Sequence, residues 1–137
     1  MIGAKAFESC EQLTDIKLPE SLMMIGDYAF YFCKNISSIN IPSPVTTIDK
    51  KAFSQCYNIK SIEIPKSVAK IGEFAFSGCS SLTSVKIPET VTEIGWGAFN
   101  ECDILTLTVE RGPYAEEYAE KKNLIYTYPD ADDWLNN

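Results

Sequence analysis

The chain repeats itself every 23 residues, and every kind of landmark residue recurs at that step. Each copy starts at an isoleucine, and an alanine–phenylalanine pair and a cysteine follow at fixed offsets; in the first four copies a proline follows as well. The recurring positions are Ile2, Ile25, Ile48, Ile71 and Ile94; Ala6, Ala29, Ala52, Ala75 and Ala98; Phe7, Phe30, Phe53, Phe76 and Phe99; Cys10, Cys33, Cys56, Cys79 and Cys102; and Pro19, Pro42, Pro65 and Pro88. A fixed period of this size is typical of stacked copies of one supersecondary unit. The sequence therefore predicts a solenoid, with one coil per repeat.

One half of each coil is predicted to be a strand. The segments 13–19, 36–42, 59–65 and 82–88 end in alternating apolar residues. Alternation with a period of two indicates a strand with one buried face, and the proline that follows ends each strand at the same height. Because the strands recur once per coil in the same direction, we expect a parallel β-sheet on one face of the solenoid.

The other half of the coil is predicted to return through turns or short 3₁₀ segments. Ala29, Phe30 and Cys33 share one side of a helical turn, but the segment is too short for a stable helix. The second residue of the repeat is glycine in four copies and Asp49 in the third. Aspartate as the sole substitute for glycine predicts a backbone with φ > 0 at this position.

We interpret residues 1–109 as an array of five repeats, of which the first and last are incomplete. The alternation of the fifth copy comes one residue early. Residues 110–128 are predicted to form a C-terminal cap, a helix that starts near Pro113 and closes at a left-handed Asn123, followed by a strand. Residues 129–137 are interpreted as an acidic tail.

The repeat resembles the BspA-type leucine-rich repeat of bacterial surface and secreted proteins, in its Ala-Phe-x-x-Cys signature and in the Gly-Pro-Tyr-Ala-Glu-Glu-Tyr-Ala segment that follows the array. The resemblance spans Ile2 to Tyr128. It implies a curved, right-handed leucine-rich repeat solenoid that serves adhesion or protein recognition, at the cell surface or after secretion. The chain opens without a basic-then-apolar signal peptide, which leaves the cytoplasm as the alternative compartment.

Composition argues against most other classes of function. The chain has no histidine, the commonest general base and metal ligand, and it has no glycine-rich phosphate loop or nucleophile elbow. Its net charge of −7 comes without a basic stripe, which disfavours nucleic acid as a partner, and no apolar run could insert into a membrane. We therefore expect no enzymatic activity and no cofactor. Asp130, Asp132 and Asp133 lack the turn glycine and closing glutamate of a calcium loop, so we interpret them as a solvated tail.

The five cysteines could bind zinc, form disulfides or remain as buried free thiols. Their spacing of 23 matches no paired zinc pattern. Successive cysteines would stack about 4.8 Å apart, within the range of disulfide geometry, but five cannot all pair. Each cysteine also lies where an interior residue is needed, so we predict buried, reduced thiols that act as small apolar side chains.

The remaining hypothesis is a binding module, and two of its faces compete. The sheet face is predicted to present Asp15, Lys17, Ser38, Asn40, Ser61, Glu63, Ser84 and Lys86. The return side is predicted to present Tyr28, Tyr31, Phe32, Phe74 and Trp96. The sheet face lacks the aromatic and arginine anchors usual in interfaces, so we favour contacts through the return side; packing of these rings on one another is the alternative.

The partner is expected to be a protein of unknown identity. The first residues start inside a repeat without a capping element, so Ile2, Phe7 and a strand edge would be exposed. A longer parent protein or self-association through this uncapped end would each cover them. An intracellular structural or scaffolding repeat protein is the alternative function.

Overall fold

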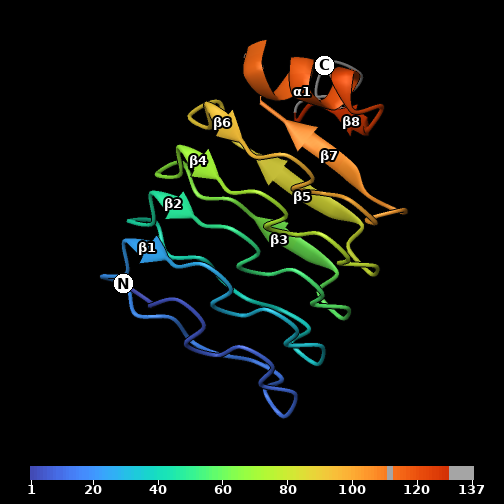
Figure 1. Cartoon of the computed structure of the whole chain (residues 1–137). Helices are drawn as coiled ribbons and strands as arrows, with labels where there is room; N and C mark the ends of the chain where they lie inside the picture. Colours follow the sequence, from blue (N-terminus) through green and yellow to red (C-terminus); the bar gives the residue numbers. More distant parts are fainter. Residues whose placement is uncertain (111–112, 130–137) are drawn as a thin grey trace.

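A computed structural model describes residues 1–110 and 113–129. The chain winds as a stack of coils, and a helix lies at the C-terminal end of the stack (Figure 1). We number the coils 1 to 5 from their first residues, Ile2, Ile25, Ile48, Ile71 and Ile94. The acidic tail predicted for residues 129–137, with Asp130, Asp132 and Asp133, lies outside the described residues apart from Pro129.

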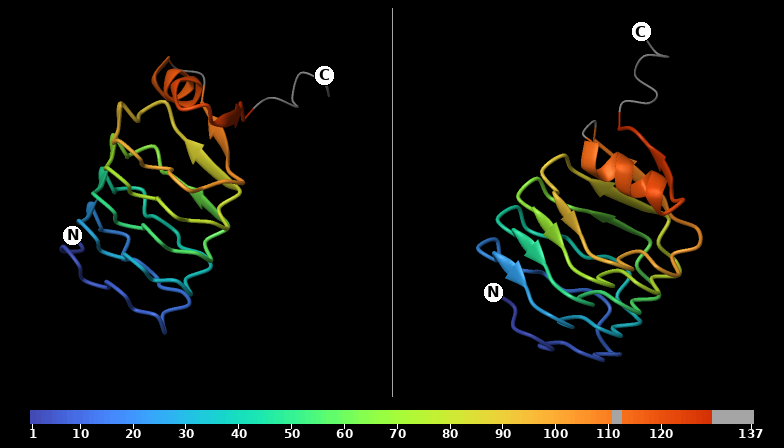
Figure 2. Two further views of the ribbon diagram at one scale, coloured as in Figure 1. Left: turned by 45° about the vertical axis from the view of Figure 1, so that its right-hand side comes forward. Right: turned by 45° about the horizontal axis from the view of Figure 1, so that its top comes forward.

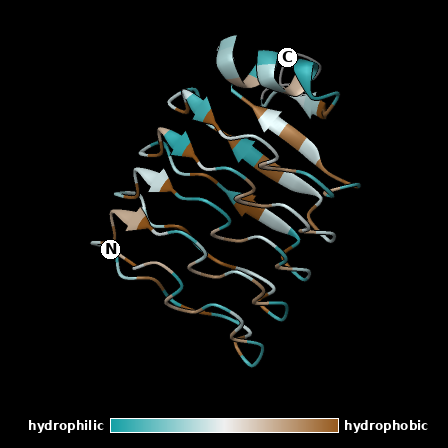
Figure 3. Ribbon diagram, viewed as in Figure 1, coloured by the Kyte–Doolittle hydropathy of each residue, from teal (hydrophilic) through white to brown (hydrophobic). Residues whose placement is uncertain are grey.

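Two parallel sheets run along the stack. The sheet predicted from the apolar alternation contains β3 (Ser61–Glu63), β5 (Ser84–Ile87), β7 (Thr106–Val109) and β8 (Ile125–Thr127), in that order. We call its outer side the sheet face. Buried and exposed residues alternate along β3 and β5, and Figure 3 shows the matching alternation of hydropathy. The predicted parallel sheet is thus confirmed from coil 3 onward.

The register between β5 and β7 confirms the shift read from the fifth repeat. Ser84 pairs with Thr106 and Ile87 with Val109, a step one residue shorter than the 23-residue period.

Coils 1 and 2 differ from the prediction, because the segments 13–19 and 36–42 form no strands. Their apolar residues still face inward, with Ile39 and Ile41 buried. Among the described residues, no backbone hydrogen bond joins residues 38–41 to a neighbouring coil. Coils 2 and 3 also differ in a side-chain hydrogen bond that joins coil 3 to the coil before it. The Ser67 hydroxyl donates to the carbonyl of Val45 in the preceding coil, whereas coil 2 has Pro44 at the equivalent position.

The second sheet was not predicted. It contains β1 (Met24–Ile25), β2 (Thr47–Ile48), β4 (Lys70–Ile71) and β6 (Glu93–Ile94), and a bridge from Ile2 to Ile25 extends it into coil 1. Each strand has two residues, too few for an alternation to be legible in the sequence. The return that follows each strand is a series of turns, as predicted, with bonds such as Ala29 N–H to Gly26 carbonyl at 3.1 Å.

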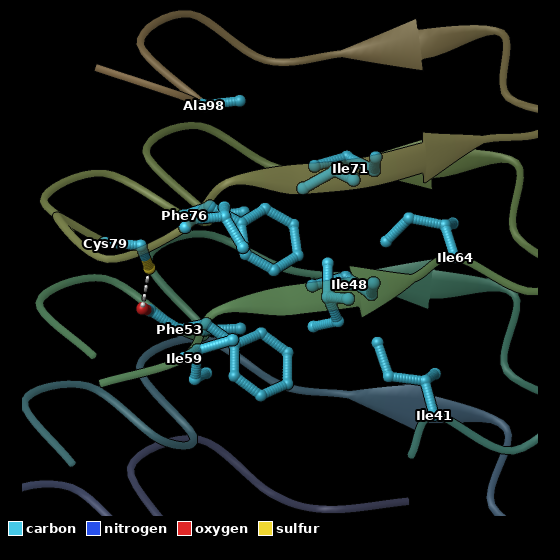
Figure 4. Close-up of a cluster of buried hydrophobic side chains, with 14 of the residues drawn as sticks. Ile41, Ile48, Phe53, Ile59, Ile64, Ile71, Phe76, Cys79 and Ala98 are labelled. Atoms are coloured by element: carbon cyan, nitrogen blue, oxygen red, sulfur yellow. Dashed lines mark hydrogen bonds between the residues drawn. The ribbon is translucent and has the colours of Figure 1, made fainter. Parts of the chain in front are cut away.

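The core between the sheets is a set of columns, one residue per coil. The phenylalanine rings stack with centroids 5.2–5.5 Å apart and interplanar angles of 4–7° from Phe7 to Phe99. Figure 4 shows Phe53 and Phe76 in this column, beside columns of buried isoleucines. The repeating sequence therefore stacks equivalent residues of successive coils on one another along the core.

The predicted cap is confirmed. Helix α1 (Pro113–Lys121) buries Ala115 and Ala119 against the stack, and Asn123 closes it with φ of 56°. Tyr118 meets Phe99, the last ring of the column, edge-on at 6.3 Å. The helix thereby covers the end of the core that coil 5 would otherwise expose (Figure 2).

The prediction for Asp49 was wrong, since Asp49 and the equivalent glycines are absent from the residues with positive φ. Gly26, Gly72 and Gly95 instead allow close approach to the backbone of the preceding coil. A Cβ on Gly72 would lie 2.6 Å from the backbone of Asp49 and Lys50 in the preceding coil. The left-handed positions are the fourth and eighth of the repeat: Lys5, Tyr28, Lys51, Phe74 and Gly97, then Ser9, Phe32, Gln55, Gly78 and Glu101.

We expect Glu101→Gly to stabilise the chain by roughly 0.5–1 kcal/mol. Glu101 is exposed and has φ of 61°, and Gly78 takes the equivalent place one coil earlier. Urea unfolding measures the change. Asp103→Gly is the control, because Asp103 is exposed nearby without positive φ and should lose stability instead. A loss at both positions would contradict the argument.

Candidate binding faces

The sheet face presents the predicted residues to solvent. Asp15, Lys17, Ser38, Asn40, Ser61, Glu63 and Ser84 are exposed, and Lys86 is half-buried. On β3 and β5 their outward direction follows from the two-residue alternation of a strand, with Ile62 and Val85 facing the core. In coils 1 and 2 the same alternation persists without a ladder.

The structure gathers these residues into two hollows. The first has a volume of about 420 Å³ and includes Asp15, Lys17, Ser38 and Asn40, beside Ile16, Leu18, Glu20 and Ile39. It lies beside residues 38–41, for which the described residues supply no backbone hydrogen bond to a neighbouring coil. The second has a volume of about 290 Å³ and is lined by Ser61, Ile62, Glu63, Ser84, Lys86 and Thr108. Small serines produce this second depression between larger charged neighbours.

Charge on the sheet face is mixed and solvated. Lys86 and Glu63 form an ion pair at 3.9 Å across neighbouring strands, with side-chain exposures of 42% and 77%. A pair this exposed contributes little free energy. Among the residues described for it, the sheet face therefore has polar hollows but no aromatic or arginine side chain that could anchor an interface.

The return side carries an aromatic cluster, which we define as Tyr28, Tyr31, Phe32 and Tyr57. The rings touch in sequence: Tyr28 to Tyr31 at 5.4 Å, Tyr31 to Phe32 at 6.2 Å and Phe32 to Tyr57 at 5.7 Å between centroids. Tyr57 was not among the predicted residues, because it lies four residues before β3 and meets Phe32 of the preceding coil only once the coils are stacked. The first three rings are half-buried.

Lysines and aromatic rings alternate along the fourth position of the repeat. The ammonium groups of Lys5 and Lys51 lie 5.7 and 5.4 Å from the centre of the Tyr28 ring, and Lys51 lies 5.6 Å from that of Phe74. All four residues are left-handed, which aims their side chains alike. Such cation–π contacts are worth on the order of 0.5–1 kcal/mol each at exposed sites. The predicted return-side residues Tyr28 and Phe74 thus belong to one continuous row.

Trp96 stands at the C-terminal end of this row. Its ring meets Phe74 edge-on at 5.1 Å, and 65% of the residue is exposed. The structure therefore joins all five predicted return-side residues into two neighbouring groups, one around Tyr31 and one at Phe74 and Trp96, with Lys51 linking Tyr28 to Phe74. The rings of the return side thus pack on one another and are also partly exposed to solvent.

The cysteines form a ladder in the interior. Cys33, Cys56, Cys79 and Cys102 are buried, as predicted, while Cys10 in the first coil is half-buried. Each buried thiol donates to the carbonyl of the phenylalanine 26 residues earlier, as Cys79 Sγ does to Phe53 at 3.2 Å (Figure 4). All five are free thiols in the structure.

Burial dominates the acid–base behaviour of this ladder. It raises the pKa of Cys56 to about 12 and that of Cys102 to about 11, and it raises the pKa values of Cys33 and Cys79 as well. A thiol is nucleophilic only as the thiolate. These four thiols are therefore protonated packing groups near neutral pH.

The described part of the chain contains no candidate metal centre. No group of three or more histidine, cysteine, aspartate or glutamate side chains there could hold a metal ion. No helix of the described residues is both long and apolar enough to cross a bilayer.

The family model for the BspA type leucine-rich repeat region matches residues 1–119 in six copies. The chain belongs to the BspA-type leucine-rich repeat family. The phenylalanine of the ring column and the cysteine of the thiol ladder recur in each of the five coils, and the close-approach glycine recurs at Gly26, Gly72 and Gly95.

Solved structures of bacterial leucine-rich repeat proteins agree with the assignment. A leucine-rich repeat protein from Bacteroides ovatus is 40% identical, with a TM-score of 0.74 over 80% of this chain and 28% of its own. The leucine-rich repeat protein of T. pallidum is 38% identical, with a TM-score of 0.77 over 78% of this chain and 50% of its own. A leucine-rich cell surface protein from Faecalibacterium prausnitzii is 35% identical, with a TM-score of 0.78 over 86% of this chain and 31% of its own.

The chain thus spans between about a quarter and a half of the length of these relatives. A search of curated proteins finds no significant match.

Proposed function

We propose that this chain is a non-catalytic protein-recognition or adhesion module that works at the cell surface or after secretion. The observation that carries the proposal is family membership together with the similarity to a cell surface protein from Faecalibacterium prausnitzii. Stacked coils also provide what recognition needs, a rigid scaffold that repeats side chains at a fixed spacing.

The partner-binding surface in this proposal is the return side. Aromatic side chains dominate the energetic centres of protein interfaces because they bury large areas at low entropic cost. The aromatic cluster holds its rings in place by mutual contact, so their order precedes binding. The sheet face offers mostly serines and solvated charges, which suit the rim of an interface better than its centre.

Self-association of this chain through coil 1 is the second contact in the proposal. Ile2, Phe7, Cys10, Leu13 and Ile16 in coil 1 are only partly buried against the core. Phe7 has a ring neighbour in Phe30 on one side, and no ring contact on its other side is present in the described residues. Self-association through this end would bury these apolar groups.

A double substitution, Tyr31→Ser with Phe32→Ser, should weaken binding more than ten-fold while the melting temperature falls by only a few degrees. Both rings are half-buried; they contact each other, and they contact Tyr28 and Tyr57 in turn. We would measure binding to an array of extracellular proteins, and self-association by sedimentation velocity.

The matched control is Glu63→Ser with Lys86→Ser, which alters the sheet face and should leave binding unchanged. Binding lost in this control and kept in the ring variant would move the site to the sheet face. A large fall in melting temperature for the ring variant would show that the rings serve the core. Absence of any saturable protein binding would contradict the recognition role.

A further inference from the structure

A pocket of about 300 Å³ lies between coil 5 and the capping helix. Its lining comes from β6 and the residues after it, and from one side of α1 and the residues that follow. The residues are Ile94, Gly95, Trp96, Tyr114, Glu117, Tyr118, Lys121 and Lys122. Figure 2 shows α1 lying across this end of the stack.

The pocket exists because the two sheets end differently. Strand β8 continues the sheet of β7 past coil 5, but β6 is the last strand of the other sheet. In the preceding coil, the carbonyl of Ile71 accepts from Gly95 N–H at 2.8 Å; for the carbonyl of Ile94, the described residues supply no equivalent backbone donor. The hydroxyl of Tyr114 covers only the N–H of Ile94, at 2.8 Å. A sheet edge with polar backbone therefore forms one wall.

Trp96 is the apolar platform of the pocket. The same position in coils 1 to 4 holds Ala4, Asp27, Lys50 and Glu73, so the solenoid does not need an aromatic residue there. The edge-on contact with Phe74 holds the indole in place, yet 65% of Trp96 remains exposed. Tyr118 adds a second ring in the lining. An ordered, exposed indole beside a cavity is suited to stack against a flat ligand.

The helix separates its charges around this pocket. Glu116 and Glu120 accept hydrogen bonds from Tyr128 and Tyr126, on the side of β8. Lys121 and Lys122 line the pocket together with the single acid Glu117, and neither lysine forms an ion pair with any described residue. The lining thus has a local charge of +1, from two lysines and one acid, on a chain whose net charge is −7.

We propose that this pocket binds a small carboxylate that carries one flat ring. The ring lies against Trp96 and Tyr118, and the carboxylate meets Lys121 and Lys122. Tyr114 already accepts through its oxygen, so its O–H remains able to donate to the ligand. The volume lies at the lower end of the range for small-molecule sites, which favours a single ring with a short acidic arm. The proposal is independent of the protein-recognition role.

The test uses the full chain with Trp134→Phe, so that Trp96 is the only indole. The probe is 3-phenylpropionate, and the neutral 3-phenylpropanol is its matched control. We expect saturable quenching or enhancement of Trp96 fluorescence with Kd on the order of 1 mM. The alcohol should bind at least five-fold more weakly, and 0.5 M salt should reduce that difference.

Two variants locate the charge. Lys121→Met with Lys122→Met should weaken binding of the acid at least five-fold and leave the alcohol unchanged. Lys60→Met with Lys66→Met removes two exposed lysines elsewhere, and it should change neither the affinity for the acid nor the affinity for the alcohol. Equal binding of acid and alcohol, a non-saturating response, or the same loss in both lysine variants would overturn the proposal. Circular dichroism verifies that each variant is folded.

Discussion

The free energy of unfolding is expected to fall steeply as the pH rises from about 9 towards 11, because the thiol ladder titrates. In the unfolded chain the cysteines lose their protons near the ordinary pKa of about 9, whereas burial raises the folded pKa to about 12 for Cys56 and to about 11 for Cys102. The pKa values of Cys33 and Cys79 are raised in the same direction. The folded state therefore holds more protons than the unfolded state above pH 9.

The sign and the size of the effect follow from this difference in protons. The stabilisation is fully present below the unfolded pKa and declines as the pH rises towards the folded pKa. Each thiol contributes about 1.4 kcal/mol per pH unit, so four thiols together give about 5 kcal/mol per unit at most. Because the folded pKa is about 11 for Cys102 and about 12 for Cys56, these two thiols together lose about 7 kcal/mol of stabilisation by pH 12. This loss is comparable with a typical domain stability of about 5–15 kcal/mol.

Urea unfolding at a series of pH values between 7 and 10.5 measures the slope. Cys56→Ala is the informative variant, because its slope should fall by about a quarter even though the cavity lowers its stability at every pH. Comparing slopes also cancels the titration of lysines and tyrosines, which both proteins share. An unchanged slope in Cys56→Ala would contradict the assignment of alkaline sensitivity to the thiols.

Phe53→Ala is expected to destabilise the chain by roughly 3–5 kcal/mol. Phe53 is fully buried and lies between Phe30 at 5.2 Å and Phe76 at 5.5 Å. Removing it leaves a gap in the middle of the ring column, where a neighbouring coil cannot close up without breaking its own ladder. Since solenoid stability is a sum of nearest-neighbour terms, the gap also weakens the coupling of coil 3 to coil 2 and to coil 4.

Urea unfolding tests this with two controls. Phe7→Ala removes a half-buried ring that has one ring neighbour in the described structure, and should cost about half as much. Ile104→Ala removes an exposed apolar side chain and should change stability by less than about 0.5 kcal/mol. Equal losses for Phe53→Ala and Phe7→Ala would mean that the ring column does not couple the coils.

The period of the sequence determined the architecture. A residue that recurs every 23 positions must stack on its own kind once the coils close, so the buried faces of Phe53, Cys56 and Ile62 could be assigned in advance. The cap was also predictable from the sequence, but for a different reason: Pro113 and Asn123 have local backbone preferences that do not depend on any neighbouring coil. Sequence also indicated which side chains point outward on the sheet face and on the return side.

Only the tertiary structure decided features that depend on the distance between coils. The glycine at the second position is set by the backbone of the preceding coil, so Asp49 was wrongly taken as evidence for positive φ. The two-residue strands acquire their identity from pairing rather than from any pattern of their own. The lack of ladder bonds at residues 38–41, and the pocket between coil 5 and α1 beside Trp96, likewise depend on how neighbouring units of the stack pack. The sequence of one repeat determines which side chains a coil buries and exposes. How closely neighbouring coils approach each other depends on the tertiary structure of the whole stack.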